Sequence, residues 1–168
     1  ANPEIGDDVN EVFKQLTGLG KASALKHLWQ APFSLHRNML AAIHGEIEAA
    51  QSGKPARIIA KMNSLLEPEI INALYEASAA GVTIDLIVRG VCSLRPGVKG
   101  LSDNIRVRSV VGRFLEHHRI FYFHANGKQA IYLSSADWME RNFFRRIEIC
   151  FPVLEPKLKR RVLKEGLK

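Results

Sequence analysis

The sequence predicts an α/β domain in which helices flank a mixed β-sheet, and a helical segment precedes that sheet. Two observations predict the sheet. A strand, a helix and a second strand follow one another over residues 57–88, which is the order of a right-handed parallel βαβ unit. An Asn-Gly pair at 126–127 separates two β-rich runs, which is a strong signal for an antiparallel hairpin. Parallel and antiparallel pairing together make the predicted sheet mixed.

Two amphipathic helices are expected before the sheet. Over residues 9–16 apolar side chains recur at helical spacing, and Asp7 and Asp8 precede them as candidate N-caps. Over residues 34–51 one apolar stripe steps by four, through Leu35, Met39, Ile43 and Ile47. Three basic side chains lie off this stripe and are interpreted as a solvated face: His36, Arg37 and His44.

The βαβ unit points to a candidate phosphate ligand. Residues 57–62 are expected to form a strand, and Pro68 suits the first turn of a helix that Gly81 can end. Residues 83–88 form the second strand, and Arg89 follows it directly. Ligands in open α/β sheets bind beyond the carboxyl ends of the strands, so Arg89 is a candidate phosphate-binding residue. The alternative is a surface ion pair.

The other segments complete a single domain. Residues 91–103 hold too many Pro and Gly residues for a regular element, whereas residues 105–108 alternate like an edge strand. Residues 145–151 are expected to form the last strand, and a basic helix begins near Glu155. The predicted parts are a helical lead-in at 1–53, a sheet core at 54–154 and a C-terminal helix at 155–168.

The hairpin carries the densest chemical signal. With a two-residue turn, Arg119 lies opposite Ser134 and His118 opposite Ser135. Side chains alternate along a strand, so His117 and Arg119 share one face and His118 points to the other. A proton-transferring histidine, an arginine and serine hydroxyls suit a phosphoryl group in transfer. The alternative is that these residues cap a buried hairpin and hydrogen-bond one another.

Composition and charge narrow the classes of partner. A formal net charge of +7 over 168 residues favours polyanions: nucleotides, polyphosphate, nucleic acid or anionic lipid, the last implying peripheral membrane association. A hydrophobic content of 46% supports a packed core. No apolar run approaches the roughly 18 residues that span a bilayer. Cys92 and Cys150 lack metal-site or disulfide-framework spacing, which fits a cytoplasmic location.

Several motifs carry a family resemblance. The His117-x-Arg119 pair and the Ser134-Ser135-Ala136-Asp137 run resemble half of a phospholipase D type site, with Arg119 in the place of that family's Lys. The flanking sequence resembles the C-terminal catalytic domain of the large bacterial polyphosphate kinase, from about Glu4 to the end. The segments that carry this second resemblance are residues 55–63, 85–97, 101–107, 114–117 and 132–139.

The resemblance implies reversible transfer of the ATP γ-phosphate to inorganic polyphosphate. In that family a preceding domain carries a phosphohistidine on a Gly-Leu-Lys-x-His motif, which nothing here matches. His117 corresponds to the second active-site histidine and Arg89 to an ATP-phosphate-binding arginine. From the hairpin geometry, Arg119, Ser134 and Ser135 are the further candidate phosphate contacts. The family's kinase is several times longer, so this chain is interpreted as an excised domain, inactive alone.

Further expectations concern the cofactor and partners. The resemblance implies Mg²⁺ with ligands outside this chain, because the sequence shows no carboxylate cluster to hold it. The partners are ATP or ADP, polyphosphate, upstream domains and, in the full-length form, further copies. Glu116 is expected to pair with Arg113 or Arg119, and Asp137 to cap a helix through Met139.

Two other functions stay open at this point. A phospholipase D type nuclease or phosphodiesterase would pair His117 from two copies and needs no missing domain. That family commonly has His-x-Lys and an Asp a few positions later, where this chain has Ala125 and Asn126. A polyanion-binding module rests on charge alone and leaves the convergence of His117, Arg119 and Ser134 unexplained. No specific nucleic acid is expected as a partner.

Overall fold

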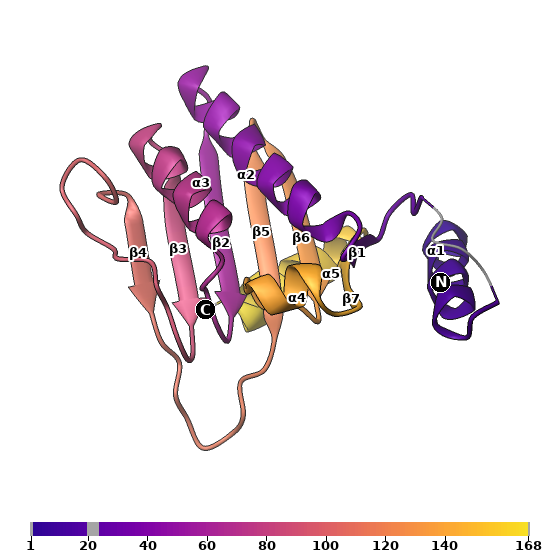
Figure 1. The fold of residues 1–168 in the computed structure, drawn as a ribbon. Helices are drawn as coiled ribbons and strands as arrows, with labels where there is room; N and C mark the ends of the chain where they lie inside the picture. The colour runs from indigo at the N-terminus through magenta and orange to yellow at the C-terminus, as the bar shows by residue number, and fades with distance from the viewer. Residues whose placement is uncertain (1, 20–23, 168) are drawn as a thin grey trace.

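One seven-stranded mixed sheet forms the centre of the computed structural model, which describes residues 2–19 and 24–167 (Figure 1). Its order is β1-β7-β6-β5-β2-β3-β4. The strands are β1 (Trp29–Ala31), β2 (Ala56–Met62), β3 (Thr83–Val88), β4 (Ile105–Arg108), β5 (Arg119–Ala125), β6 (Lys128–Ser134) and β7 (Glu148–Pro152). β2, β3 and β4 pair in parallel, and every other pair is antiparallel. The predicted mixed α/β sheet is confirmed.

Helices cover both faces of this sheet. α2 (Leu35–Gln51), α3 (Pro68–Ala79) and the short α4 (Glu140–Phe144) lie on the face toward the viewer in Figure 1. α5 (Pro156–Arg161) and the π-helical turn η1 (Val162–Gly166) lie behind it. α1 (Pro3–Leu16) stands beside the sheet, beyond β1. Among the described residues, no helix combines the length and the apolar character that crossing a membrane requires.

Alternation along the strands divides the apolar side chains between two cores. Ile58, Ala60 and Phe121 face α2 and α3, where they meet the stripe predicted for α2. Leu35, Met39 and Ile43 of that stripe are fully buried, and Ile47 is partly buried. Ile59 and Ile120 face the other way and pack with side chains of η1. Because each face has its own apolar cover, the central strands β2 and β5 are buried on both sides, which fixes their register.

The β5–β6 hairpin forms as predicted. Asn126 and Gly127 have φ values of 51° and 78°, the left-handed conformation that a two-residue type I′ turn requires. The register pairs Arg119 with Ser134, and the ladder ends there. The predicted pairing of His118 with Ser135 therefore lies beyond the ladder. The backbone N–H of Ser135 instead donates to the carbonyl of Ile149 in the β7 strand.

The N-terminal segment departs from expectation. The lead-in is not helical throughout, because β1 joins the sheet by pairing with β7. α1 begins earlier than predicted, and the side chain of Asn2 caps it by accepting the backbone N–H groups of Glu4 and Ile5 at 2.9 and 3.3 Å. β7 begins at Glu148, three residues after the predicted start. Residues 1 and 168, at the ends of the predicted domain, lie outside the described residues.

Asp8 does not cap α1. Its buried carboxylate accepts the backbone N–H groups of Lys26, His27 and Leu28, at 3.0, 2.7 and 2.9 Å respectively. Burial alone would raise the pKa of Asp8, but these hydrogen bonds outweigh it and hold the pKa below the usual range. The residue predicted to start the helix therefore ties the helix to the segment that leads into β1.

Two glycine substitutions should change stability in opposite directions. Gly127→Ala should lower the free energy of unfolding by about 1–2 kcal/mol, because Gly127 needs a positive φ. Gly45→Ala should raise it by about 0.5–1 kcal/mol, because Gly45 lies in α2 and a Cβ there would meet nothing within 4 Å. Urea unfolding of the two variants measures both. A change in the free energy of unfolding of the same sign in both variants would contradict the assigned turn.

Candidate functional site

The predicted site residues gather at one edge of the sheet. β2 and β3 end at the lower edge in Figure 1, where β5, antiparallel to β2, begins. The loop of residues 109–118 hangs below this edge before the chain enters β5 (Figure 1). Three predicted site residues therefore lie at this edge: Arg89 after β3, His117 before β5 and Ser134 at the end of β6.

Asp137 links several segments at this edge through hydrogen bonds. Its buried carboxylate accepts the backbone N–H of Asn63 at 2.7 Å and that of Ser64 at 3.4 Å. It also accepts two N–H groups of Arg119, from Nη2 at 2.9 Å and from Nε at 3.2 Å. Burial would raise the pKa of Asp137, but the Arg119 hydrogen bond, the Asn63 backbone N–H and the Arg119 charge together hold it below the usual range.

Asp137 was expected to cap a helix, and that expectation is wrong. The N-cap of α4 is Met139, which makes no side-chain cap. Asp137 instead joins three segments that are far apart in the chain: the end of β2, the start of β5 and the turn after β6. One carboxylate can do this because its two oxygens accept several hydrogen bonds at once.

Arg119 holds the histidine loop in place. Besides its two bonds to Asp137, it donates from Nη1 to the backbone carbonyl of His117 at 3.0 Å. The guanidinium fork is rigid and planar, so its bond to Asp137 fixes the direction in which it holds His117. Arg119 is thus a positioning residue in this structure. Its expected contact with a phosphate stays a prediction.

The two serines also have partners within the chain. The Ser134 hydroxyl donates to the carbonyl of Ile149 at 3.0 Å and accepts the N–H of Ala136 at 3.0 Å. The Ser135 hydroxyl donates to the carboxylate of Glu148 and accepts the N–H of Ile149 at 3.1 Å. These bonds order the turn after β6. The predicted phosphate contacts of Ser134 and Ser135 stay predictions.

Glu148 and Asn142 were missed from the sequence. Asn142 donates from Nδ2 to the second carboxylate oxygen of Glu148 at 2.7 Å, and both residues are buried. Glu148 therefore receives hydrogen bonds from α4 and from the serine turn. A charged residue at an alternate position of an otherwise apolar strand was the available signal, because a buried carboxylate requires hydrogen-bond partners.

Arg89 follows β3 and contacts the first residue of the loop before β5. Its carbonyl oxygen accepts the hydroxyl of Ser109 at 3.2 Å. Its side chain lines a cavity of about 340 Å³ together with residues 110–116, and its Nη1 atom is buried without a hydrogen-bond partner. His117 is exposed and does not line this cavity. A common surface shared by Arg89 and His117 stays a prediction.

Glu116 pairs with Lys61, and the predicted pairing with Arg113 or Arg119 is wrong. The Nζ atom of Lys61 lies 2.7 Å from the Glu116 carboxylate and also donates to the carbonyl of Gly166 at 3.0 Å. Hydrogen bonds from Lys61 and His118 lower the pKa of Glu116. Lys61 was not singled out in the sequence, although a lysine within an apolar strand is unusual enough to suggest a buried partner.

His118 faces away from the Arg119 cluster. Its Nδ1 atom lies 3.4 Å from the Glu116 carboxylate, and both residues line a cavity of about 440 Å³ between the sheet and η1. Neither His117 nor Arg119 lines that cavity. The position of His118 agrees with the predicted alternation, and the shared face of His117 and Arg119 stays a prediction.

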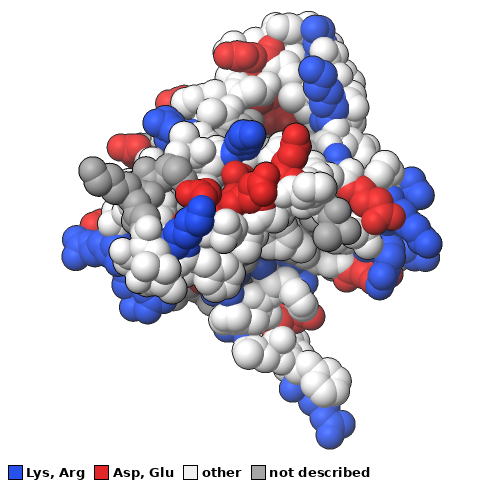
Figure 2. Space-filling model, turned by 90° about the vertical axis from the view of Figure 1, so that its right-hand side faces the viewer, with Lys and Arg blue, Asp and Glu red and all other residues white. Residues whose placement is uncertain are grey.

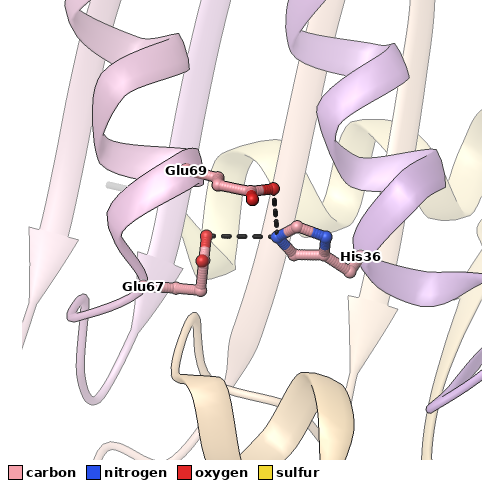
Figure 3. Close-up of side chains that lie close together, drawn as sticks. All are labelled: His36, Glu67 and Glu69. Atoms are coloured by element: carbon pink, nitrogen blue, oxygen red, sulfur yellow. Dashed lines mark ion pairs between the residues drawn. The ribbon is translucent and has the colours of Figure 1, made fainter.

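Three side chains of types that can ligate a metal lie close together between α2 and α3 (Figure 3). The Nε2 atom of His36 is 3.2 Å from Glu67 Oε2 and 3.7 Å from Glu69 Oε2. His36 was expected on a solvated face, but it packs against the rings of Phe143 and Phe144. Glu67 caps α3 by accepting the N–H of Ile70 at 2.7 Å. The close approach of these side chains links the two helices, and the His36 Nε2 atom is buried without a hydrogen-bond partner among the described residues.

The fold resembles that of a solved protein of the phospholipase D family. The chain superposes on Nuc from Salmonella typhimurium, a phospholipase D family member, with a TM-score of 0.57 over 82% of this chain and 88% of that one. The two sequences are 17% identical, so this likeness concerns the fold alone. The architecture is that of a phospholipase D type domain.

The family follows from the sequence. Residues 28–165 match the family described as polyphosphate kinase C-terminal domain 2, and the chain belongs to that family. Polyphosphate kinase from Burkholderia cenocepacia is 65% identical over 99% of this chain, and that from Paraburkholderia phytofirmans is 64% identical over the same share. The solved polyphosphate kinase of Porphyromonas gingivalis is 43% identical, with a TM-score of 0.94 over 98% of this chain. The chain spans 24% of those two relatives and 25% of the solved chain.

The buried Arg119–Asp137 pair should be worth far more than an exposed pair of the same length. Asp137→Ala should lower the free energy of unfolding by about 3–5 kcal/mol, because it leaves the Arg119 charge buried without a partner. Glu140→Ala removes the exposed Arg145–Glu140 pair, which has the same 2.9 Å separation, and should cost at most about 1 kcal/mol. Urea unfolding at neutral pH measures both.

The Asp137 effect should also depend on pH. Its folded-state pKa is lowered, so the carboxylate stabilises the fold at pH values above its unfolded pKa of about 4 and loses that effect as pH falls further. The difference between the unaltered chain and Asp137→Ala should therefore shrink in acid. A difference that stays constant down to about pH 2 would exclude the ion pair as its source.

Proposed function

We propose that this chain is the C-terminal half of a polyphosphate kinase active site, which reversibly transfers the ATP γ-phosphate to inorganic polyphosphate within a longer polypeptide. The family match over residues 28–165 carries this proposal. The edge of the sheet fits it, because phosphoryl transfer asks a protein mainly for positioning and for charge neutralisation. The chain alone is proposed to be inactive, since the phosphohistidine belongs to an upstream domain.

The proposed roles divide among three residues. His117 is the acid that serves the leaving oxygen, since it is exposed at the end of the loop, where a substrate can reach it. Arg89 binds ATP phosphate, and the support is its position directly after β3 at the carboxyl edge of the sheet, where it lines the cavity of the loop. Arg119 keeps the His117 backbone in place through the bond to its carbonyl. Ser134 and Ser135 would reach a phosphate only after giving up one of their present bonds.

Mg²⁺ is the proposed cofactor, and its ligands are proposed to come from phosphate oxygens and the upstream region. Mg²⁺ neutralises and bridges phosphate oxygens when it is bound. The two carboxylates that flank His117 in the described structure are both engaged, Glu116 with Lys61 and Asp137 with Arg119. They do not fit the role of free metal ligands. A cytoplasmic location, homo-oligomerisation and contact with a membrane surface belong to the same proposal.

The nuclease and polyanion-binding alternatives have less support. The likeness to Nuc is one of fold, at 17% identity, whereas relatives at 65% identity are polyphosphate kinases. Charge alone would suit a polyanion-binding module, but it leaves unexplained why Arg119, held by Asp137, fixes the backbone of an exposed histidine.

Replacing His117 tests the catalytic role. In the longer kinase, His117→Gln should lower turnover by roughly 100-fold or more and leave ATP affinity nearly unchanged, because only the proton donor is lost. His118→Gln is the matched control, since His118 faces the other cavity, and it should change turnover little. Steady-state kinetics and ATP-binding calorimetry measure the two variants. Near-normal turnover in His117→Gln would exclude the role.

Replacing Arg89 tests binding. Arg89→Ala in the longer kinase should weaken ATP binding by roughly 10-fold or more, because a charge-assisted hydrogen bond contributes about 1.5–3 kcal/mol. Turnover should fall as well. Arg106→Ala is the control, because Arg106 is an exposed arginine on the edge strand β4. Equal ATP affinities in the two variants would remove Arg89 from the phosphate site.

A further inference from the structure

The loop before β5 presents an unusual group of exposed apolar side chains. Val111, Phe114 and Leu115 are 84%, 81% and 74% exposed. The loop projects below the sheet in Figure 1, and the same protrusion extends below the body of the molecule in Figure 2. Single exposed apolar residues are ordinary on protein surfaces, but three within five positions form a patch of the kind that marks an interaction site. We call these three side chains the crest.

Contacts at both ends of the loop fix the position of the crest. At one end of the loop, the Ser109 hydroxyl is bonded to the Arg89 carbonyl. At the other end, Glu116 is paired with Lys61 and the His117 carbonyl with Arg119. Both ends are therefore fixed to the sheet. A loop fixed in this way presents its apolar side chains to a partner at a lower entropic cost than a free loop.

The loop also lies close to the proposed phosphate-binding residue Arg89. Residues 110–116, the crest among them, line one cavity of about 340 Å³ together with Arg89. Of the two residues proposed to act on phosphate, Arg89 contacts the first end of this loop through Ser109, and His117 lies at its second end. Whatever covers the crest is therefore brought against the proposed site.

We propose that the crest docks into an apolar depression on the upstream part of the same polypeptide, and so sets that part against His117 and Arg89. The inference rests on the proposed function, in which an upstream domain supplies the other half of the site. The chain is 24–25% of the length of its relatives, so most of each relative's polypeptide lies outside this structure. The contact determines how far the upstream phosphohistidine lies from His117.

The competing occupant is a second copy of this chain. Two crests meeting across a two-fold axis would also bury the apolar side chains, and this would bring two His117 residues together. The test must therefore separate a contact within one polypeptide from a contact between two.

Photo-cross-linking in the longer kinase makes this separation. A benzophenone side chain replaces Phe114 in one sample and Phe33, an exposed aromatic residue outside the loop, in the control. Light and heavy isotope-labelled proteins are mixed before irradiation, and the cross-linked peptides are identified by mass spectrometry. The expected result is a cross-link from position 114 to peptides upstream of residue 1, within molecules of one label.

Every other outcome overturns the proposal. Cross-links of mixed label would assign the crest to a second copy. Cross-links confined to residues 1–168, or a yield at position 114 no higher than at position 33, would show that the upstream part does not cover the crest. None of these readouts requires activity. A kinase that cross-links as expected but makes no polyphosphate would refute the proposed function and leave the docking intact.

Phe114→Ser adds a functional readout. Removing an aromatic side chain that the docking would bury should weaken the docking by roughly 10-fold or more, and turnover should fall with it. Phe33→Ser should leave turnover unchanged. Peptide-level hydrogen exchange on Phe114→Ser should show faster exchange in the upstream segment that cross-links to position 114, which a loss of local folding in the loop would not produce. Unchanged turnover and exchange would contradict the docking.

Discussion

The edge of the sheet that carries the site depends on one buried ion pair. Asp137 and Arg119 are nearly enclosed, and between them they bind the end of β2, the turn after β6 and the backbone of His117. A buried charge is costly unless it is paired and hydrogen-bonded, so neither residue can leave without disturbing the other. The hydrogen bond from Arg119 therefore fixes the backbone position from which the exposed His117 side chain extends.

Much of the fold could be predicted from the sequence because its signals are local. The Asn126-Gly127 turn fixed the register of Arg119 and Ser134, and the spacing of Leu35, Met39 and Ile43 fixed the buried face of α2. β1 could not be found in this way. It is three residues long, and its pairing partner in β7 lies more than a hundred residues further along the chain.

The hydrogen-bond and ion-pair partners of the carboxylates were the part of the structure that the sequence predicted least well. Asp8, Glu116 and Asp137 each looked like a local cap or a near-neighbour ion pair, and each instead binds a distant segment. Propensity rules describe which role a carboxylate takes in its own helix or turn, whereas a buried carboxylate takes the partners that the assembled fold brings to it. The family resemblance indicated His117 and Arg89 as candidate site residues, but it did not indicate the contacts that hold the His117 backbone in place.

The order of strands in the sheet constrains how the chain can fold. β2 lies between β3 and β5, and its pairing with β5 must wait until residues 119–125 are available. The outer strand β1 must wait longer still, for β7. Pairings so distant in sequence must close large loops before they gain contacts, which slows folding. During synthesis, α2 and the first βαβ unit therefore emerge with one side of β2 unpaired, and they depend on the late hairpin to cover it.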